Sequence, residues 1–394
     1  MTTARHETTP DPAAPGPVRD PEPVPVRDPE PVPVPEPVPI PEPAPGPERD
    51  PEPAHRPAKP PAPAAPPVPG TPGPARRRGA RRRGTSVVIC SAALALLLAL
   101  AGHVGLPELP GHLGSLAETL LPWTALGVPA LAAPALLRGS RTATASLLLP
   151  VTAWLTVFGG TLTDKSSAGG DLTLVSHNVN QANPDPRGTA RSLIAARADV
   201  VALQELDPDT APAYAAALAD AYPYHFSQGT VGLWSTRPLR DARAVPIMPW
   251  TRAMRATVVT PEGPLAVYVA HLPSVRVGPS GFTAGTRNEV VDVLAGILRA
   301  ERAPRLVVMG DFNGSTDDRA LRPLTRGMTS VQAAAGEGFG FTWPSRLPLV
   351  RIDQILLKGA RATAAWTLPA TPSDHLPVAA RIRLDRAPRA AAGP

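Results

Sequence analysis

Cysteine is almost absent from this sequence, since Cys90 is the only one in 394 residues. A single cysteine excludes an internal disulfide, and it leaves no group of thiolates that could form a typical zinc site. Cys90 also lies inside an apolar run, so it gives no indication of the redox compartment in which the chain works.

Lysine is scarce as well, and arginine carries most of the positive charge. After Lys165 the chain contains only Lys358. The formal net charge is +6, and a cluster of arginines between Arg76 and Arg83 supplies a large part of it. Because this positive charge is so local, it does not indicate a nucleic-acid-binding surface on the rest of the chain.

Proline is abundant, with 55 residues, and most of them lie before residue 75. Residues 1–75 repeat units of the type Pro-Glu-Pro-Val. Since proline lacks an amide hydrogen and fixes φ, neither a helix nor a sheet can propagate through such a repeat. We therefore expect residues 1–75 to form a disordered, extended tail, which acts as a spacer, binds a proline-recognising domain or has no specific partner.

Three long apolar runs follow, within an expected membrane anchor at residues 76–165. They cover residues 85–104, 119–137 and 142–163. A helix of about 20 apolar residues spans a bilayer, so each run predicts a transmembrane helix. The middle run is the least regular, because Pro129 and Pro134 interrupt it. A secretory signal peptide is disfavoured, since the first run follows a long tail and no small-residue cleavage motif accompanies it.

The positive charges predict how these helices are oriented. Arginines precede the first run, and Arg138 and Arg141 lie between the second and the third, whereas residues 103–118 carry no lysine or arginine. Positively charged loops tend to stay in the cytoplasm, so three crossings place the rest of the chain on the extracytoplasmic side of the cell membrane. The sequence thus predicts a multi-pass protein that has the lipid bilayer as a partner. With only two crossings the same part would be cytoplasmic.

From residue 170 to residue 386 the sequence has the pattern of an α/β domain. Short apolar runs typical of strands alternate with segments of helical periodicity. The strand-like runs are 172–175, 200–203, 265–269, 306–309, 352–357 and 378–384, and the helical segments are 189–198 and 285–302. Residues 261–264 have the composition of a hairpin turn. This pattern predicts two packed mixed sheets with helices on the outside.

A polar side chain ends, precedes or interrupts each strand-like run. These residues are Asn178, Glu205, His271, Asp311, Asn313, Asp353, Asp374 and His375. Each alone could be a turn or cap residue, but strand ends on one side of a sheet converge on one pocket. Carboxylate and amide oxygens are the ligands that Mg²⁺ and Mn²⁺ prefer, and a histidine beside them can take a proton from water. The set therefore predicts metal-dependent hydrolysis of a phosphate ester.

The same residues lie in six short motifs whose order resembles that of the endonuclease/exonuclease/phosphatase superfamily, which includes the DNase I-like nucleases. The motifs are SHNVN, LQELD, AHLPS, GDFN, IDQIL and SDHLPV, all within residues 171–385. The resemblance implies a four-layer α/β sandwich and a divalent metal, Mg²⁺ or Mn²⁺. It also implies an enzyme that hydrolyses phosphate esters.

Applied motif by motif, the resemblance implies a site for a metal and a phosphate. Glu205 is then the principal metal ligand, Asn178 lies beside both the metal and the phosphate, and Asp374 lies near the metal. The chain departs from many nuclease members at Asn180, where those members have an acid. This departure weakens the case for a second metal ligand at that position and leaves Glu205 unaffected.

The resemblance also implies the catalytic residues. Asp311 and Asn313 orient the attacking water and stabilise the transition state. His375 is the general base or contacts the phosphate, and Asp353 orients its ring. His271 contacts the phosphate or protonates the leaving group.

The substrate is less well defined by the residues. After His271 the chain offers Arg276 and Arg287 but no lysine run or aromatic platform of the kind that holds nucleic acid. Arg287 is a candidate phosphate contact. A domain tethered to the membrane suits a lipid-linked phosphate or a cell-envelope pyrophosphate. In layout the chain resembles the actinobacterial-type membrane proteins associated with teicoplanin resistance, and no obligate protein partner is evident.

Two alternatives stay open. The domain could be an extracellular metal-dependent nuclease that acts on nucleic acid. It could also be a catalytically silent, membrane-bound binding module, although such a module would be expected to have lost Glu205, Asp311 or His375, and all three are present.

Overall fold

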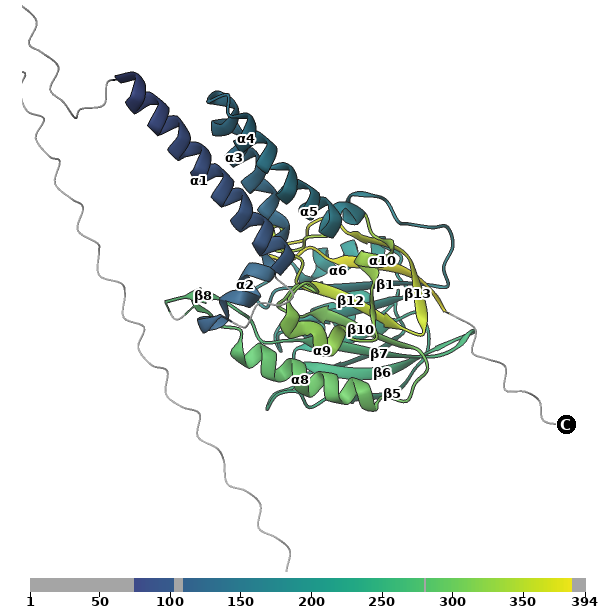
Figure 1. Ribbon diagram of the computed structural model, residues 1–394. Coiled ribbons are helices and arrows are strands. Elements are labelled where there is room, and N and C mark those ends of the chain that lie inside the picture. The colour runs from purple at the N-terminus through teal and green to yellow at the C-terminus, as the bar shows by residue number, and fades with distance from the viewer. Residues whose placement is uncertain (1–73, 103–108, 280, 385–394) are drawn as a thin grey trace, which may run out of the picture. The chain divides into compact units, whose positions relative to one another are not determined.

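The computed structural model of the chain describes residues 74–102, 109–279 and 281–384. Nearly all of the expected proline-rich tail therefore lies outside the described residues, as do residues 103–104 of the first expected membrane helix and residues 385–386 of the expected domain. The described residues belong to one compact unit, Gly70–Pro394. From Leu172 onward they form two six-stranded sheets that pack against each other (Figure 1).

Sheet A contains both the first and the last strand of the domain. Its strands lie in the order β13 (Ala360–Thr367), β14 (Val378–Leu384), β1 (Leu172–Asn178), β2 (Val200–Gln204), β4 (Val231–Ser235) and β3 (Tyr224–Gln228). The β1 and β2 strands are parallel, and all other neighbours are antiparallel. The carboxyl ends of β1 and β2 therefore lie at the same edge of the sheet.

Sheet B also has six strands, of which one neighbouring pair is parallel. Its strands lie in the order β11 (Thr329–Ser330), β12 (Asp353–Lys358), β10 (Leu306–Asp311), β7 (Gly263–His271), β6 (Ala253–Thr260) and β5 (Leu239–Ala244). The β7 and β10 strands are parallel. The predicted hairpin is confirmed, since β6 and β7 pair up to Thr260 and Gly263. A separate small ribbon joins β8 (Val277–Gly278) to β9 (Gly281–Phe282).

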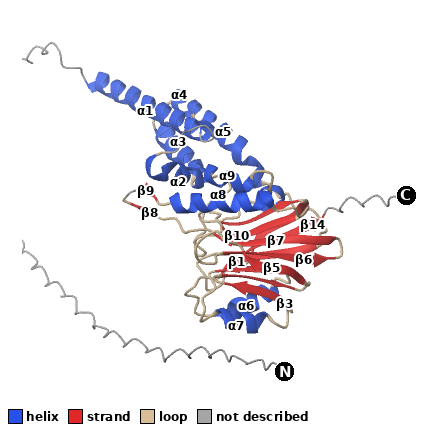
Figure 2. Cartoon of the chain, turned by 90° about the horizontal axis from the view of Figure 1, so that it is seen from below, coloured by secondary structure: helices blue, strands red, loops and turns tan. Residues whose placement is uncertain are grey.

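Successive side chains of a strand enter different apolar layers. On β10, Val307 and Met309 pack between the two sheets, whereas Leu306 and Val308 pack under the helices outside sheet B. The helices of the domain are α6 (Pro186–Ala195), α7 (Ala211–Leu218), α8 (Gly285–Ala300), α9 (Arg322–Thr325), α10 (Val331–Ala335) and the 3-10 turn η4 (Arg319–Leu321). The α6 and α7 helices cover sheet A, and α8 and α9 cover sheet B (Figure 2). The predicted four-layer α/β sandwich is confirmed.

A group of apolar helices precedes the sandwich. These are α1 (Pro74–Gly102), α2 (Leu113–Thr119), α3 (Gly127–Leu137), α4 (Arg141–Ser146) and α5 (Leu148–Phe158), with the 3-10 turns η1 (Pro110–His112), η2 (Leu121–Leu126) and η3 (Gly159–Leu162). Two stretches, Arg83–Gly102 and Arg141–Leu162, are long and apolar enough to cross a membrane. They correspond to the first and third expected spans.

The middle expected span, residues 119–137, is not one straight helix. Its residues belong to a pair of segments, Pro110–Thr119 and Leu121–Leu137, which are bent by 71° at the break between them. Pro122 opens η2, and Pro134 lies inside α3, so prolines interrupt the regular hydrogen bonding of this region. The described residues therefore contain two helices of membrane-spanning length, or three spans if the bent pair counts as one.

Candidate active site

The predicted polar residues lie at one edge of the sandwich because the directions of the strands bring them there. In sheet A, the parallel strands β1 and β2 end at Asn178 and just before Glu205. In sheet B, the ends of the parallel strands β7 and β10 pair His271 with Asp311. The β12 strand is antiparallel to β10 and therefore begins at this edge, with Asp353 opposite Asp311.

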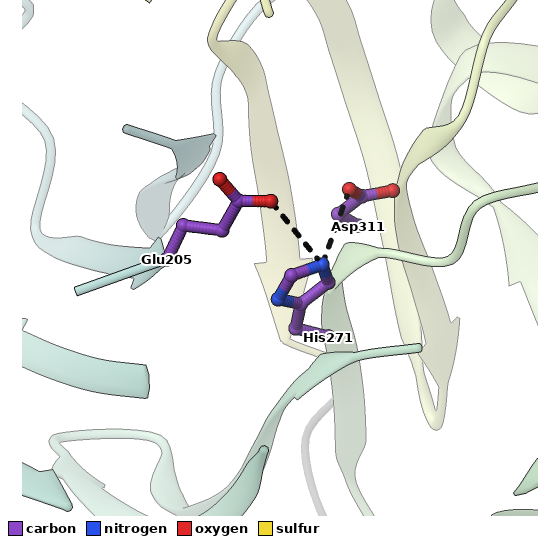
Figure 3. A group of neighbouring side chains, drawn as sticks. All are labelled: Glu205, His271 and Asp311. Carbon is purple, nitrogen blue, oxygen red and sulfur yellow. Dashed lines mark ion pairs between the residues drawn. The ribbon is translucent and has the colours of Figure 1, made fainter. Parts of the chain in front are cut away.

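Glu205, His271 and Asp311 form a first cluster, in which one possible ligand atom from each lies within 4.8 Å of the others. The Nε2 atom of His271 is 3.6 Å from Glu205 Oε1 and 3.7 Å from Asp311 Oδ2 (Figure 3). Asn178 connects the two carboxylates, since its Nδ2 donates to the same two oxygens at 3.0 Å each. Its Oδ1 accepts from the backbone N–H of Asn180.

Asp311, Asp353 and His375 form a second cluster, and all three residues are buried. The Nδ1 atom of His375 lies 2.9 Å from Asp353 Oδ2, and its Nε2 lies 3.9 Å from Asp311 Oδ2. The other oxygen of Asp353 is buried and has no hydrogen-bond partner among the described residues. Since the two clusters share Asp311 Oδ2, this oxygen is the centre of the arrangement.

Burial and crowded charges set the protonation of these groups. Burial raises the pKa of Asp311; His375 opposes that rise, and the nearby Asp353 carboxylate adds to it. For His375, burial favours the neutral ring, but the carboxylates of Asp353 and Asp311 outweigh it and raise the pKa of the imidazole. Burial, together with the cations of Arg252 and His375, holds the pKa of His271 well below its usual range. His271 is therefore neutral, whereas His375 favours the charged form.

Three loops at this edge hold a non-glycine residue in the left-handed region of φ. The φ angles are 59° at Glu205, 62° at Asn180 and 46° at Asn313. Such conformations cost free energy and tend to persist where the surrounding contacts impose them. At Asn313 those contacts are clear: its backbone N–H donates to Asp311 Oδ1 at 2.8 Å, and its Nδ2 donates to the carbonyl oxygen of Leu272 at 2.9 Å.

The glycine before Asp311 is required by a close approach of two strands. Gly310 has a φ of 146°, and a Cβ at this position would lie 1.9 Å from the carbonyl oxygen of Ala270 on β7. Only glycine therefore lets β10 pair with β7 up to the site. Phe312, two residues after Gly310, is buried in the apolar layer under α8. The motif GDFN thus places two polar side chains, Asp311 and Asn313, at the site and one aromatic ring in the core.

A model of the endonuclease/exonuclease/phosphatase family matches residues 175–375, and this range includes every member of both clusters. The chain belongs to the endonuclease/exonuclease/phosphatase family. Members of the family are hydrolases that act on phosphate esters and generally depend on a divalent metal. This chain is accordingly a phosphoric ester hydrolase, and its acidic and histidine clusters are candidate metal-binding groups.

Several solved structures are similar to part of this chain. One is D. rerio TDP2 complexed with a single-strand DNA product, with 20% identity, a TM-score of 0.46 and coverage of 54% of this chain and 98% of that one. Another is the beta toxin of Staphylococcus aureus, with 16% identity, a TM-score of 0.44 and coverage of 53% and 99%. The Bacteroides thetaiotaomicron mannosyl-6-phosphatase Bt3783 has 14% identity, a TM-score of 0.45 and coverage of 54% and 99%. A search of curated proteins gave no match.

Asp374, expected near the metal of this family, is placed at the rim of the site. Its side chain is exposed, and it belongs to neither cluster of described residues. Its Oδ1 accepts from Asn180 Nδ2 at 2.9 Å, and its Oδ2 accepts from Trp343 Nε1 at 3.2 Å. Both oxygens accept from these partners, so Asp374 lies outside the two clusters of described residues, and its place near a metal stays a prediction.

Arg287, the expected phosphate contact, lies behind the site. Its side chain is 0% exposed, and its Nη2 forms an ion pair with Asp318 at 2.7 Å. The same Nη2 donates to Ser115 Oγ, and Nη1 donates to the carbonyl oxygen of Asn313 at 3.0 Å. The expectation of a direct phosphate contact does not fit this position, because the guanidinium is enclosed and already paired. Arg287 instead supports the loop that carries Asn313.

Arg252 is a candidate that the sequence does not single out. Its Nη2 lies 2.7 Å from Nδ1 and 2.5 Å from Nε2 of His271, and its charge acts on both carboxylates of the first cluster. Arg252 directly precedes β6, and no motif in the sequence distinguishes it from Arg255, which lies within that strand. Arg252 reaches the site because β6 pairs with β7, whose last residue is His271.

Proposed function

We propose that this chain is a membrane-anchored phosphoesterase that uses Mg²⁺ or Mn²⁺ to hydrolyse a phosphate ester or pyrophosphate of a lipid-linked or cell-envelope substrate. The observation that carries the proposal is the position of Asp311, whose Oδ2 belongs to both clusters of acidic and histidine side chains. Membership of the family supports hydrolysis of phosphate esters in general. The two helices of membrane-spanning length support the anchor.

The first cluster suits a hard divalent cation. The carboxylates of Glu205 and Asp311 and the neutral imidazole of His271 approach one another, and such oxygen-rich sites are those that Mg²⁺ and Mn²⁺ prefer. We assign Glu205 as the principal ligand and Asn178 as the residue that keeps the two carboxylates at a fixed spacing. When bound, the cation would stabilise negative charge on the phosphoryl oxygens.

The second cluster suits binding of the phosphate and transfer of a proton. Asp353 holds the His375 ring through Nδ1, so its Nε2–H is directed toward the space beside Asp311, where it would donate to a phosphoryl oxygen. Asp311 and Asn313 would orient the attacking water, and Asp311 would take its proton. As the water oxygen bonds to phosphorus, the bond between phosphorus and the leaving oxygen breaks. His271 would contact the phosphate from the other side.

The test of activity uses the full chain in detergent with Mg²⁺ and three substrates: bis-p-nitrophenyl phosphate, plasmid DNA and a polyprenyl pyrophosphate. We expect release of product that EDTA abolishes. Glu205→Gln should lower kcat/KM by more than about 100-fold, since even residues behind a metal ligand cost up to about that much. Glu289→Gln, an exposed acid on α8, is the matched control.

The three substrates separate the alternatives. Cleavage of DNA alone would favour a nuclease and contradict the lipid-linked substrate. Wild-type protein that acts on none of the three would favour a silent binding module. Full activity of Glu205→Gln would contradict the assignment of the metal ligand.

The extracytoplasmic position of the sandwich is a separate part of the proposal, because it requires three crossings. Arg138 and Arg141 between the second and third segments favour that count. Since Cys90 is the only cysteine, Cys90→Ser gives a background for a single reporter, Ser166→Cys, in the exposed linker before β1. A membrane-impermeant maleimide should label this reporter in intact cells. Labelling only after lysis would place the sandwich in the cytoplasm.

A further inference from the structure

A cavity of about 340 Å³ lies between the end of the apolar helices and the sandwich. Part of its lining is apolar and comprises Phe158, Phe339 and Phe341. Another part is charged and comprises Lys165, Asp317 and Arg351. Such a volume is sufficient for a small ligand or for the head group of a larger one. None of these six residues belongs to the two clusters of the candidate active site.

The apolar lining begins where a membrane-length helix ends. Phe158 is the last residue of α5, within the apolar stretch Arg141–Leu162. Its ring lies against Phe339, with the ring centroids 5.8 Å apart, and Phe339 stacks on Phe341 at 5.1 Å. A row of aromatic rings therefore extends from the end of the helix along the cavity. Rings in this position suit a hydrocarbon chain that leaves the bilayer.

The charged lining has two cations and one carboxylate. Arg351 Nη2 donates to Thr316 Oγ1 at 2.7 Å, and Lys165 Nζ donates to the carbonyl oxygen of Gly160 at 2.8 Å. Burial lowers the pKa of Arg351, and the nearby Asp317 opposes that shift. The carboxylate of Asp164 also acts on Lys165, but it is exposed to solvent and lies outside the lining. The lining itself therefore holds two cations and one carboxylate, and it suits an additional anion.

Two loops connect the cavity to the catalytic clusters. Ser315, in the cavity lining, follows Asn313 by two residues, and Arg351 precedes Asp353 by two residues. Gln354 ties the loops together, because its Nε2 donates to the carbonyl oxygens of Gly314 and Arg351. An anion held by Arg351 would therefore lie next to the candidate active site.

We propose that this cavity binds the anionic phosphate-monoester head group of a membrane lipid, with the phosphate beside Arg351 and Lys165 and the start of the hydrocarbon chain along Phe158, Phe339 and Phe341. The inference rests on the proposed membrane-anchored phosphoesterase and names lipids with a phosphate-monoester head group as its substrate class. A soluble phosphate ester lacks the apolar part and would depend on the catalytic clusters alone. Arg351 and Lys165 are thus residues that determine specificity.

Binding is tested without turnover, on the full chain in lipid nanodiscs that contain EDTA and a photoactivatable phosphatidic acid. We expect crosslinks in the peptides that contain Phe158 and Phe339. Unlabelled phosphatidic acid should compete, whereas phosphatidylcholine and inorganic phosphate should not. Crosslinking at these peptides by a phosphatidylcholine probe to the same extent would overturn the proposal.

Arg351→Gln and Lys165→Gln should each lower this crosslinking about tenfold, the effect of losing one charge-assisted hydrogen bond. Lys165 is only half-buried, so Lys165→Gln remains informative even if Arg351→Gln does not fold. Arg191→Gln, an exposed arginine on α6, is the matched control and should have no effect. The assignment of Lys165 and Arg351 as phosphate contacts would be overturned if crosslinking were unchanged in Lys165→Gln and if Arg351→Gln either crosslinked to the same extent or did not fold.

Turnover gives a second, independent measurement. In the presence of Mg²⁺, Lys165→Gln should lower kcat/KM for phosphatidic acid about tenfold relative to kcat/KM for bis-p-nitrophenyl phosphate. The change should come from a higher KM for the lipid. An equal fall for both substrates would show that Lys165 does not determine specificity. Wild-type protein that crosslinks the lipid at the cavity but hydrolyses neither substrate would support the cavity and contradict the proposed function.

Discussion

A buried ion pair joins the apolar helices to the sandwich and offers a sharp test of their packing. Arg287 on α8 and Asp318 are both 0% exposed, and Nη2 lies 2.7 Å from Oδ2. Ser115 on α2 donates to the same Asp318 oxygen and accepts from Arg287 at 2.8 Å. A neighbouring pair repeats the connection, since Glu118 on α2 accepts from Arg319 Nε at 2.7 Å.

Asp318→Asn keeps the size of the side chain and removes its charge. The Arg287 cation then stays buried without a counter-ion, and loss of one partner of a buried pair costs about 3–5 kcal/mol. In a domain of this size each kcal/mol corresponds to about 2–4 °C in Tm. We therefore expect the Tm of Asp318→Asn to fall by about 6–20 °C. Ser115→Ala removes one hydrogen bond and should cost about 1 kcal/mol.

Thermal unfolding of the full chain in detergent, followed by circular dichroism, measures this shift. Asp292→Asn is the matched control, because Asp292 is exposed on the same helix as Arg287. At temperatures where the variant is folded, kcat should also fall, since Arg287 holds the carbonyl of Asn313. A shift in Tm no larger than that of the control would refute the reasoning, because it would mean that the cation is not enclosed as described.

Three further results are expected. Mg²⁺ at about 100 times its dissociation constant should stabilise the protein by about 2.7 kcal/mol, seen as a rise in Tm that Glu205→Gln abolishes; an equal rise in the variant would place the metal elsewhere. Gly310→Ala should lower the free energy of unfolding by more than about 1 kcal/mol, since alanine is strained at a φ of 146° and its Cβ would lie 1.9 Å from the Ala270 carbonyl oxygen; an unchanged midpoint in urea would contradict this. Burial lowers the pKa of His177 from 6.5 to about 3, so the unfolded chain binds more protons between these values and stability falls as the pH drops below 6.5. The loss should be about 2 kcal/mol at about pH 5, and urea unfolding of His177→Phe should lack this part of the pH dependence.

Much of the fold and the centre of the site follow from local patterns in the chain. The alternation of short apolar runs with helical segments predicts the layers, because each strand must bury both faces and each helix one face. Parallel strands carry their carboxyl ends to one edge, which is why Glu205, Asp311 and His271 could be expected together before any contact was known. Asp353 begins β12 and His375 precedes β14, and they reach the same edge because these two strands run antiparallel to their neighbours, which is a feature of the tertiary structure.

Other features depend on which distant segments pack together. Arg252 directly precedes a strand and Arg287 lies in the helix expected at residues 285–302. Strand pairing brings Arg252 to His271, whereas helix packing encloses Arg287 against Asp318. Asp374 accepts hydrogen bonds from Asn180 and Trp343, which lie far from it in the sequence. The cavity likewise joins residues near 158 to residues near 350. The periodicity of a segment predicts which of its side chains are buried. A long polar side chain, however, can reach several partners. Its actual partner depends on contacts between distant segments, which no local pattern in the sequence encodes.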